Sequence, residues 1–74
     1  MSKTFSGKGV VKILCREFGF FVVSQKGSHV KLRKKVGGVA ITTIIPIHPQ
    51  LAIGTLRGIL KLAKIDFDDF YSKR

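Results

Sequence analysis

Two histidines are the side chains of this sequence best suited to moving protons at neutral pH, and one of them stands among cations. His29 follows the pair Gly27-Ser28, with Lys26 before the pair and Lys31 and Arg33 after it. Histidine titrates near neutrality, so it can accept or donate a proton. Neighbouring cations can hold a phosphate and stabilise charge that develops on it. Because RNA supplies its own nucleophile, the ribose 2′-hydroxyl, a protein needs little more than a proton acceptor, a proton donor and cations to cleave it.

The other candidate groups are weaker. We interpret His48, which lies between Ile47 and Pro49, as a turn or surface residue, with a substrate contact as the alternative. Cys15 is expected to be a small core residue. This cysteine and the two histidines lack the close spacing of metal ligands, and the sequence contains neither a carboxylate pair for acid–base work nor a glycine-rich nucleotide loop. The sequence therefore predicts no metal and no cofactor.

The charge of the chain indicates the class of partner. The chain contains fourteen Lys and Arg residues and four Asp and Glu residues, which gives a formal net charge of +10. Three of the acids are Asp66, Asp68 and Asp69, so residues 1–65 contain a single one, Glu17. A basic surface attracts polyanions at long range and gains free energy from counterion release. The alternatives are a cationic face that serves only solubility and a surface that meets an acidic protein.

The length of the chain limits its architecture. With 74 residues, we expect one domain over 1–74, with a core over about 6–65 and a short helical turn over 66–72. The one cysteine cannot form an intrachain disulfide, which fits a reducing compartment. No apolar run approaches the roughly 20 residues that span a bilayer, and the N-terminus lacks a signal-peptide pattern. We therefore expect a cytoplasmic protein that has no membrane contact and is monomeric when free.

Hydrophobic periodicity and turn residues predict the order of elements. Ser6 is a suitable N-cap for the first helix, Gly19 follows its end, and Pro46 ends the pairing of the last strand. The predicted elements are a helix over 7–17, strands over 20–25, 29–34 and 39–45, a helix over 54–63 and a last helical turn capped by Asp66. The three strands are most simply an antiparallel meander.

The two faces of this sheet are expected to differ. Both helices must bury an apolar surface, so both should cover the same side of the sheet. Val30 and Leu32 point to one side of their strand, whereas His29, Lys31 and Arg33 point to the other. The expected fold is therefore α+β, with the histidine on an open and basic sheet face.

Several segments also carry a family resemblance over nearly the whole chain. They are SGKGVVKIL at 6–14, FGF at 18–20, SQKGSHVKLRK at 24–34, PIHP at 46–49 and GTLRGILKLAKI at 54–65. In these segments the chain resembles HicA-type (YcfA-like) toxins of toxin–antitoxin pairs. The resemblance implies a fold similar to double-stranded-RNA-binding domains, an mRNA endonuclease that needs no metal, and a HicB-type antitoxin that masks the active face. By position, it implies that His29 is the catalytic histidine and Gly27 the turn glycine before it.

The sequence departs from the family pattern at two positions. Gly9 stands where an acid usually completes a capping box with Ser6, and Lys64 stands where a glycine usually closes the second helix. Both positions are helix ends. We therefore expect the departures to affect local stability more than the residues around His29.

Together these observations predict a metal-independent endoribonuclease that cleaves mRNA, the toxin of a type II toxin–antitoxin pair. Lys26, Lys31 and Arg33 would bind phosphate, while His29 would assist attack of the 2′-hydroxyl or protonate the leaving 5′-oxygen. The products would be a 2′,3′-cyclic phosphate and a free 5′-hydroxyl. The alternatives are a non-catalytic RNA-binding module of the same fold and a basic interaction protein for an acidic partner.

Overall fold

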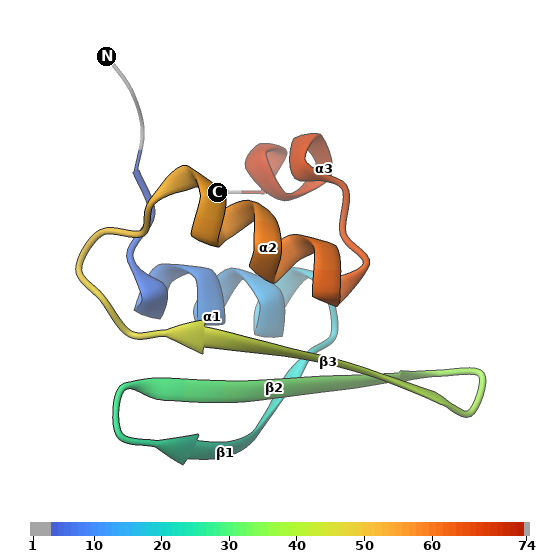
Figure 1. The fold of residues 1–74 in the computed structure, drawn as a ribbon. Coiled ribbons are helices and arrows are strands. Elements are labelled where there is room, and N and C mark those ends of the chain that lie inside the picture. The colour runs from blue at the N-terminus through green and yellow to red at the C-terminus, as the bar shows by residue number, and fades with distance from the viewer. Residues whose placement is uncertain (1–3, 74) are drawn as a thin grey trace.

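The chain folds as a three-stranded sheet with its helices on one side (Figure 1). The computed structural model describes residues 4–73. Its elements are, in order, α1 (Gly7–Glu17), β1 (Phe21–Lys26), β2 (His29–Val36), β3 (Val39–Pro46), α2 (Ile53–Ala63) and α3 (Phe67–Ser72). The strands form an antiparallel meander in the order β1-β2-β3. The predicted α+β fold is confirmed, and the arrangement is consistent with a double-stranded-RNA-binding domain.

The strand boundaries differ from the sequence prediction in ways that have local causes. The hairpin of β2 and β3 is longer than expected, since pairing continues from His29 opposite Pro46 to Val36 opposite Val39. Backbone pairing does not require the apolar alternation, which fades after Arg33. Phe20, expected as the first residue of a strand, instead precedes β1, because its N–H donates to the Leu14 carbonyl at 3.1 Å.

The core lies between the helices and one face of the sheet. Val30 and Leu32 are buried there, as the alternation of their strand predicted. The rest of the core comes from the helices, from β3, and from Phe20 and Leu51 in connecting segments, and its most deeply buried large side chains include Leu14, Ile45 and Phe70. Thr43 is buried among these residues, and its hydroxyl donates to the Ile59 carbonyl at 2.9 Å. That bond satisfies the polar group and fastens α2 to the sheet.

α1 and α3 begin with the expected side-chain caps, whereas α2 begins after Ala52 without a side-chain cap and ends at Lys64. The Ser6 hydroxyl accepts from the Gly9 N–H at 2.9 Å, and Asp66 caps α3 by accepting from the Asp68 N–H at 3.2 Å. Lys64 closes α2 in the left-handed conformation, with φ 61° and ψ 37°. A side chain is strained in that conformation, which explains why a glycine suits this position. Over the described residues, no helix is long and apolar enough to cross a membrane.

A close backbone contact joins the start of α1 to the segment that follows β3. The Gly7 N–H donates to the His48 carbonyl at 2.8 Å, and a Cβ on Gly7 would lie 2.7 Å from the Ile47 Cα and collide with the Pro46 carbonyl oxygen. The Ile47 N–H in turn donates to the Ser28 carbonyl at 2.6 Å. This chain of contacts, here called the backbone junction, connects α1 with the turn that precedes β2.

Replacing Gly7 with alanine is expected to destabilise the protein, because its Cβ meets main-chain atoms that cannot rotate away. Overpacking of this kind costs about 1–3 kcal/mol, to be measured as the free energy of unfolding in urea. Gly9→Ala is the matched control, since its Cβ would approach only the Ser6 hydroxyl, at 3.1 Å. If Gly7→Ala unfolds at the same urea concentration as the unaltered protein, the junction is not the constraint described here.

Candidate active site on the open sheet face

A two-residue turn brings Lys26 and His29 directly opposite each other at one end of the sheet. Gly27 is the first residue of this turn and has a positive φ of 58°, as type II′ hairpin turns require of their first central residue. The side-chain amide of Gln25 donates to the Gly27 carbonyl at 3.1 Å. The turn therefore has a defined geometry, and it fixes the separation of the lysine and the histidine.

His29 lines a shallow hollow on the open face of the sheet. The hollow has a volume of about 770 Å³, and its lining residues are Ser24, Gln25, Lys26, His29, Lys31 and Ile44. Lys31 pairs with Ser24 on one side and with Ile44 on the other, and side chains of directly opposed residues project from the same face. The histidine and two of the predicted phosphate-binding lysines thus share one solvent-accessible site.

Four of the predicted residues do not line the hollow, namely the turn residues Gly27 and Ser28 together with Arg33 and His48. Arg33 is four residues beyond His29 on β2, which corresponds to about 13 Å along a strand. Its Nε donates to the Thr42 hydroxyl at 3.2 Å, so the guanidinium is oriented across the open face by β3. His48 is exposed in the segment after β3 and does not line the hollow. The backbone oxygen of His48, however, belongs to the backbone junction.

The structure adds Ser24, Gln25 and Ile44 to the site, and none of the three was predicted. Ser24 follows an apolar run whose register slips at Val23, where β1 contains a bulge, so simple alternation could not assign its face. Ile44 is 45% exposed and stands beside the buried Ile45. Because both residues are apolar, their types alone could not show which one faces the core. The register with β2 supplies that information.

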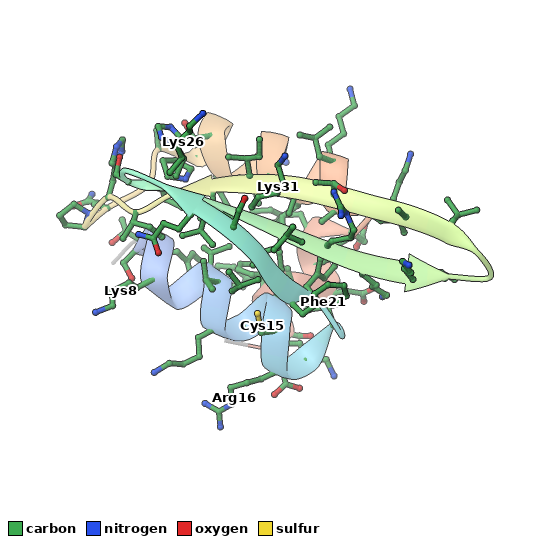
Figure 2. All side chains as sticks on the ribbon, turned by 90° about the horizontal axis from the view of Figure 1, so that it is seen from below. Lys8, Cys15, Arg16, Phe21, Lys26 and Lys31 are labelled. Atoms are coloured by element: carbon green, nitrogen blue, oxygen red, sulfur yellow. The ribbon has the colours of Figure 1, made fainter. Side chains whose placement is uncertain are left out.

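An aromatic side chain also lies on the open face. Phe21 pairs with Arg33 and is 49% exposed, whereas the adjacent Phe20 is buried. Figure 2 views this face from below and shows Phe21 near one end of β1, with Lys26 and Lys31 towards the other. The face therefore presents an aromatic ring and a guanidinium at one end and the histidine with two lysines at the other.

The electrostatic character of this face is uniformly basic. None of the three strands contains an acidic residue. Cys15 lies on α1, and burial raises the pKa of its thiol above the ordinary value, which disfavours the nucleophilic thiolate. Within residues 4–73, no three His, Cys, Asp or Glu side chains are grouped so as to hold a metal ion. Among the described residues of the hollow, His29 is therefore the group best suited to move a proton.

Comparison with known families assigns most of the chain to one family. The family model described as the HicA toxin of bacterial toxin–antitoxin systems matches residues 7–65, from the first residue of α1 to the end of the segment after α2. No curated protein matches the chain significantly. The matched region contains the turn, the hollow and the backbone junction, and it covers most of the sequence. The chain therefore belongs to the HicA toxin family of bacterial toxin–antitoxin systems.

Proposed function

We propose that this protein is a metal-independent endoribonuclease that cleaves mRNA, acting as the toxin of a type II toxin–antitoxin pair. The observation that carries the proposal is the convergence of His29, Lys26 and Lys31 on one exposed hollow in a member of the HicA toxin family. The hollow provides a proton carrier and two cations. Cleavage that uses the 2′-hydroxyl of RNA itself requires little more from a protein.

In the proposed reaction, the 2′-oxygen of one ribose attacks the adjacent phosphorus while the bond from phosphorus to the 5′-oxygen breaks. One proton must leave the 2′-hydroxyl, and one must reach the 5′-oxygen. His29 performs one of these transfers, either accepting the first proton or donating the second, and solvent water in the open hollow exchanges the other proton. Lys26 and Lys31 stabilise the negative charge that grows on the phosphate oxygens. The products are a 2′,3′-cyclic phosphate and a free 5′-hydroxyl.

The remaining open face is proposed to hold the RNA on one side of the cut. Arg33 is held across the sheet by Thr42, and a phosphate can occupy its free N–H groups. Phe21, exposed beside Arg33, offers a ring on which a base can stack. These contacts read the RNA backbone and the aromatic surface of a base, so they favour single-stranded segments without fixing a sequence. His48 lies further away and is kept as a second, weaker candidate for a substrate contact.

We also propose that a HicB-type antitoxin inhibits the toxin by covering this face. A basic surface without acids attracts an acidic partner as well as RNA, so the two compete for the same cations. In this proposal the toxin is monomeric when free, and the antitoxin hides the hollow around His29 from solvent.

Replacing His29 with alanine is expected to lower the rate of RNA cleavage by about 10²–10⁴-fold, the usual contribution of a general acid or base. The measurement is single-turnover cleavage of a labelled mRNA fragment in EDTA. His48→Ala is the comparison variant: this exposed histidine lies outside the hollow, and as the weaker candidate contact it should lose far less of the cleavage rate than His29→Ala. Unchanged cleavage by His29→Ala would refute the assignment, and intact RNA with the unaltered protein would favour a non-catalytic RNA-binding module.

Replacing Lys31 with alanine is expected to weaken RNA binding and to reduce its salt dependence. Each phosphate neutralised on a single strand contributes about 0.7 to the slope of log affinity against log salt concentration. The titration uses the His29→Ala background, so that the RNA stays intact. Lys61→Ala, which alters an exposed lysine of α2, is the control and should leave the slope unchanged. Equal slopes for the Lys31 and Lys61 variants would show that RNA does not lie across the open face.

A further inference from the structure

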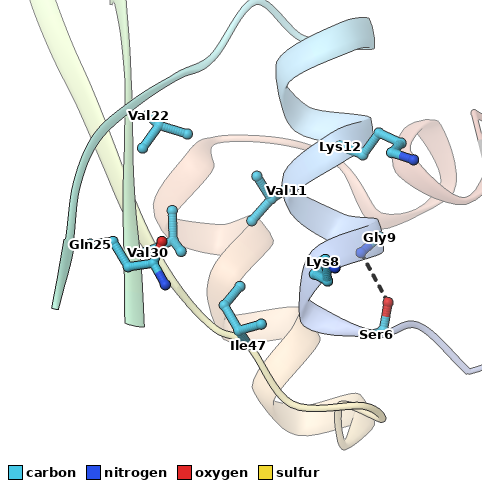
Figure 3. A pocket seen from close by; sticks show the side chains of 9 residues that line it. All are labelled: Ser6, Lys8, Gly9, Val11, Lys12, Val22, Gln25, Val30 and Ile47. Carbon is cyan, nitrogen blue, oxygen red and sulfur yellow. Dashed lines mark hydrogen bonds between the residues drawn. The ribbon is translucent and has the colours of Figure 1, made fainter. Parts of the chain in front are cut away.

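A second hollow lies on the opposite side of β1, between this strand and α1. Its volume is about 710 Å³, and its apolar walls come from Val11, Val22, Val30 and Ile47. Figure 3 shows Val11 on α1 facing the sheet side chains across this space, here called the α1–β1 groove. The groove lies on the other side of the sheet from His29, because Val22 pairs with Leu32 and so belongs to the helix-facing side. The two hollows adjoin at Gln25, which lines both of them.

The strand that borders this groove has an unpaired edge. β1 is the first strand in the order β1-β2-β3, so it pairs with β2 alone. All six of its residues are exposed, and Val22 and Val23 leave 52% and 40% of their surface in solvent. In Figure 2 the first turns of α1 lie clear of β1, and the two elements converge towards the other end of the helix. A strand edge with exposed valines beneath a helix can accept another strand.

The charge along the groove is positive. Lys8 and Lys12 stand one helical turn apart on α1, both are exposed, and both contribute to the lining. Within the described part of the chain, no acidic residue lines the groove and neither lysine makes an ion pair. The floor is aliphatic and partly formed by the buried Val30, so it suits apolar side chains rather than phosphates or stacked bases.

We propose that the α1–β1 groove binds an extended segment of a partner protein, in which apolar residues alternate with acidic ones. The segment pairs with the free edge of β1 as a fourth strand, so that main-chain hydrogen bonds supply affinity and alternate side chains supply specificity. Its apolar residues pack against Val11 and Val22, and its carboxylates approach Lys8 and Lys12. Because the groove lies behind β1, this docking does not depend on RNA cleavage and leaves the hollow around His29 exposed.

The test is an NMR titration of the full, ¹⁵N-labelled chain. The added peptide has eight residues, alternating valine and glutamate, with both of its ends blocked. Titration is expected to shift the amide resonances of α1 around Val11 and of β1 from Val22 to Gln25, and to slow hydrogen exchange along β1. Shifts centred instead on Lys31 and Arg33, or no saturable shifts, would overturn the proposal. The proposal would also be overturned if single-stranded RNA displaced the bound peptide and reversed these shifts. The groove would then be an RNA-binding surface.

Two further experiments distinguish specific docking in the groove from nonspecific electrostatic attraction to a basic protein. The double variant Lys8→Glu and Lys12→Glu should weaken the peptide at least tenfold, whereas Lys61→Glu with Lys73→Glu, which changes the net charge equally at exposed sites, should have little effect. Equal weakening by both pairs would overturn the charge argument.

A peptide that is N-methylated at alternate residues cannot donate hydrogen bonds to β1. Its affinity for the protein should therefore be at least tenfold lower, and undiminished binding would overturn strand addition. Amide dispersion in the same spectra verifies that each variant is folded.

Discussion

The close approach of Gly7 to the backbone of Pro46 and Ile47 is the constraint on which the rest of the structure depends. It brings the first turn of α1 against the chain as it leaves β3, at a distance that excludes any side chain. The hydrogen bond from Ile47 to the Ser28 carbonyl then extends the contact to the turn before β2. Helix, sheet and turn thus meet through main-chain atoms, which have little freedom to adjust. The position of His29 relative to the core follows from this arrangement.

The separation of two faces is the second consequence of the packing. Both long helices bury their apolar sides on one face of a small sheet, and Thr43 fastens α2 to it through the Ile59 carbonyl. The other face keeps its lysines, Arg33 and the histidine in solvent. These side chains do not pack in the core, so core packing does not determine their types. None of the three strands contains an acidic residue, so the charged side chains of this face are all basic.

Much of this arrangement was predictable from the sequence, and the parts that were not have physical reasons. The alternation around Val30 and Leu32 placed His29, Lys31 and Arg33 on one face, and the register confirms it. Ile44 could not be assigned, because a run of apolar residues does not identify which one faces the core. The role of Gly7 was also invisible, since a close approach between main chains leaves no mark on hydrophobic periodicity. Lys64 was recognised as a poor helix end, and its positive φ explains why.

The central claim is that the hollow around His29 cleaves RNA by using the 2′-hydroxyl of the substrate. The most direct measurement maps one cleavage position in a chosen RNA and repeats the reaction on the same strand with a single 2′-deoxy substitution just before the cut. Cleavage is expected to disappear at that position, while binding and cleavage elsewhere on the strand continue. Undiminished cleavage at the deoxy position would contradict the claim, because the attacking group would then come from water or from the protein.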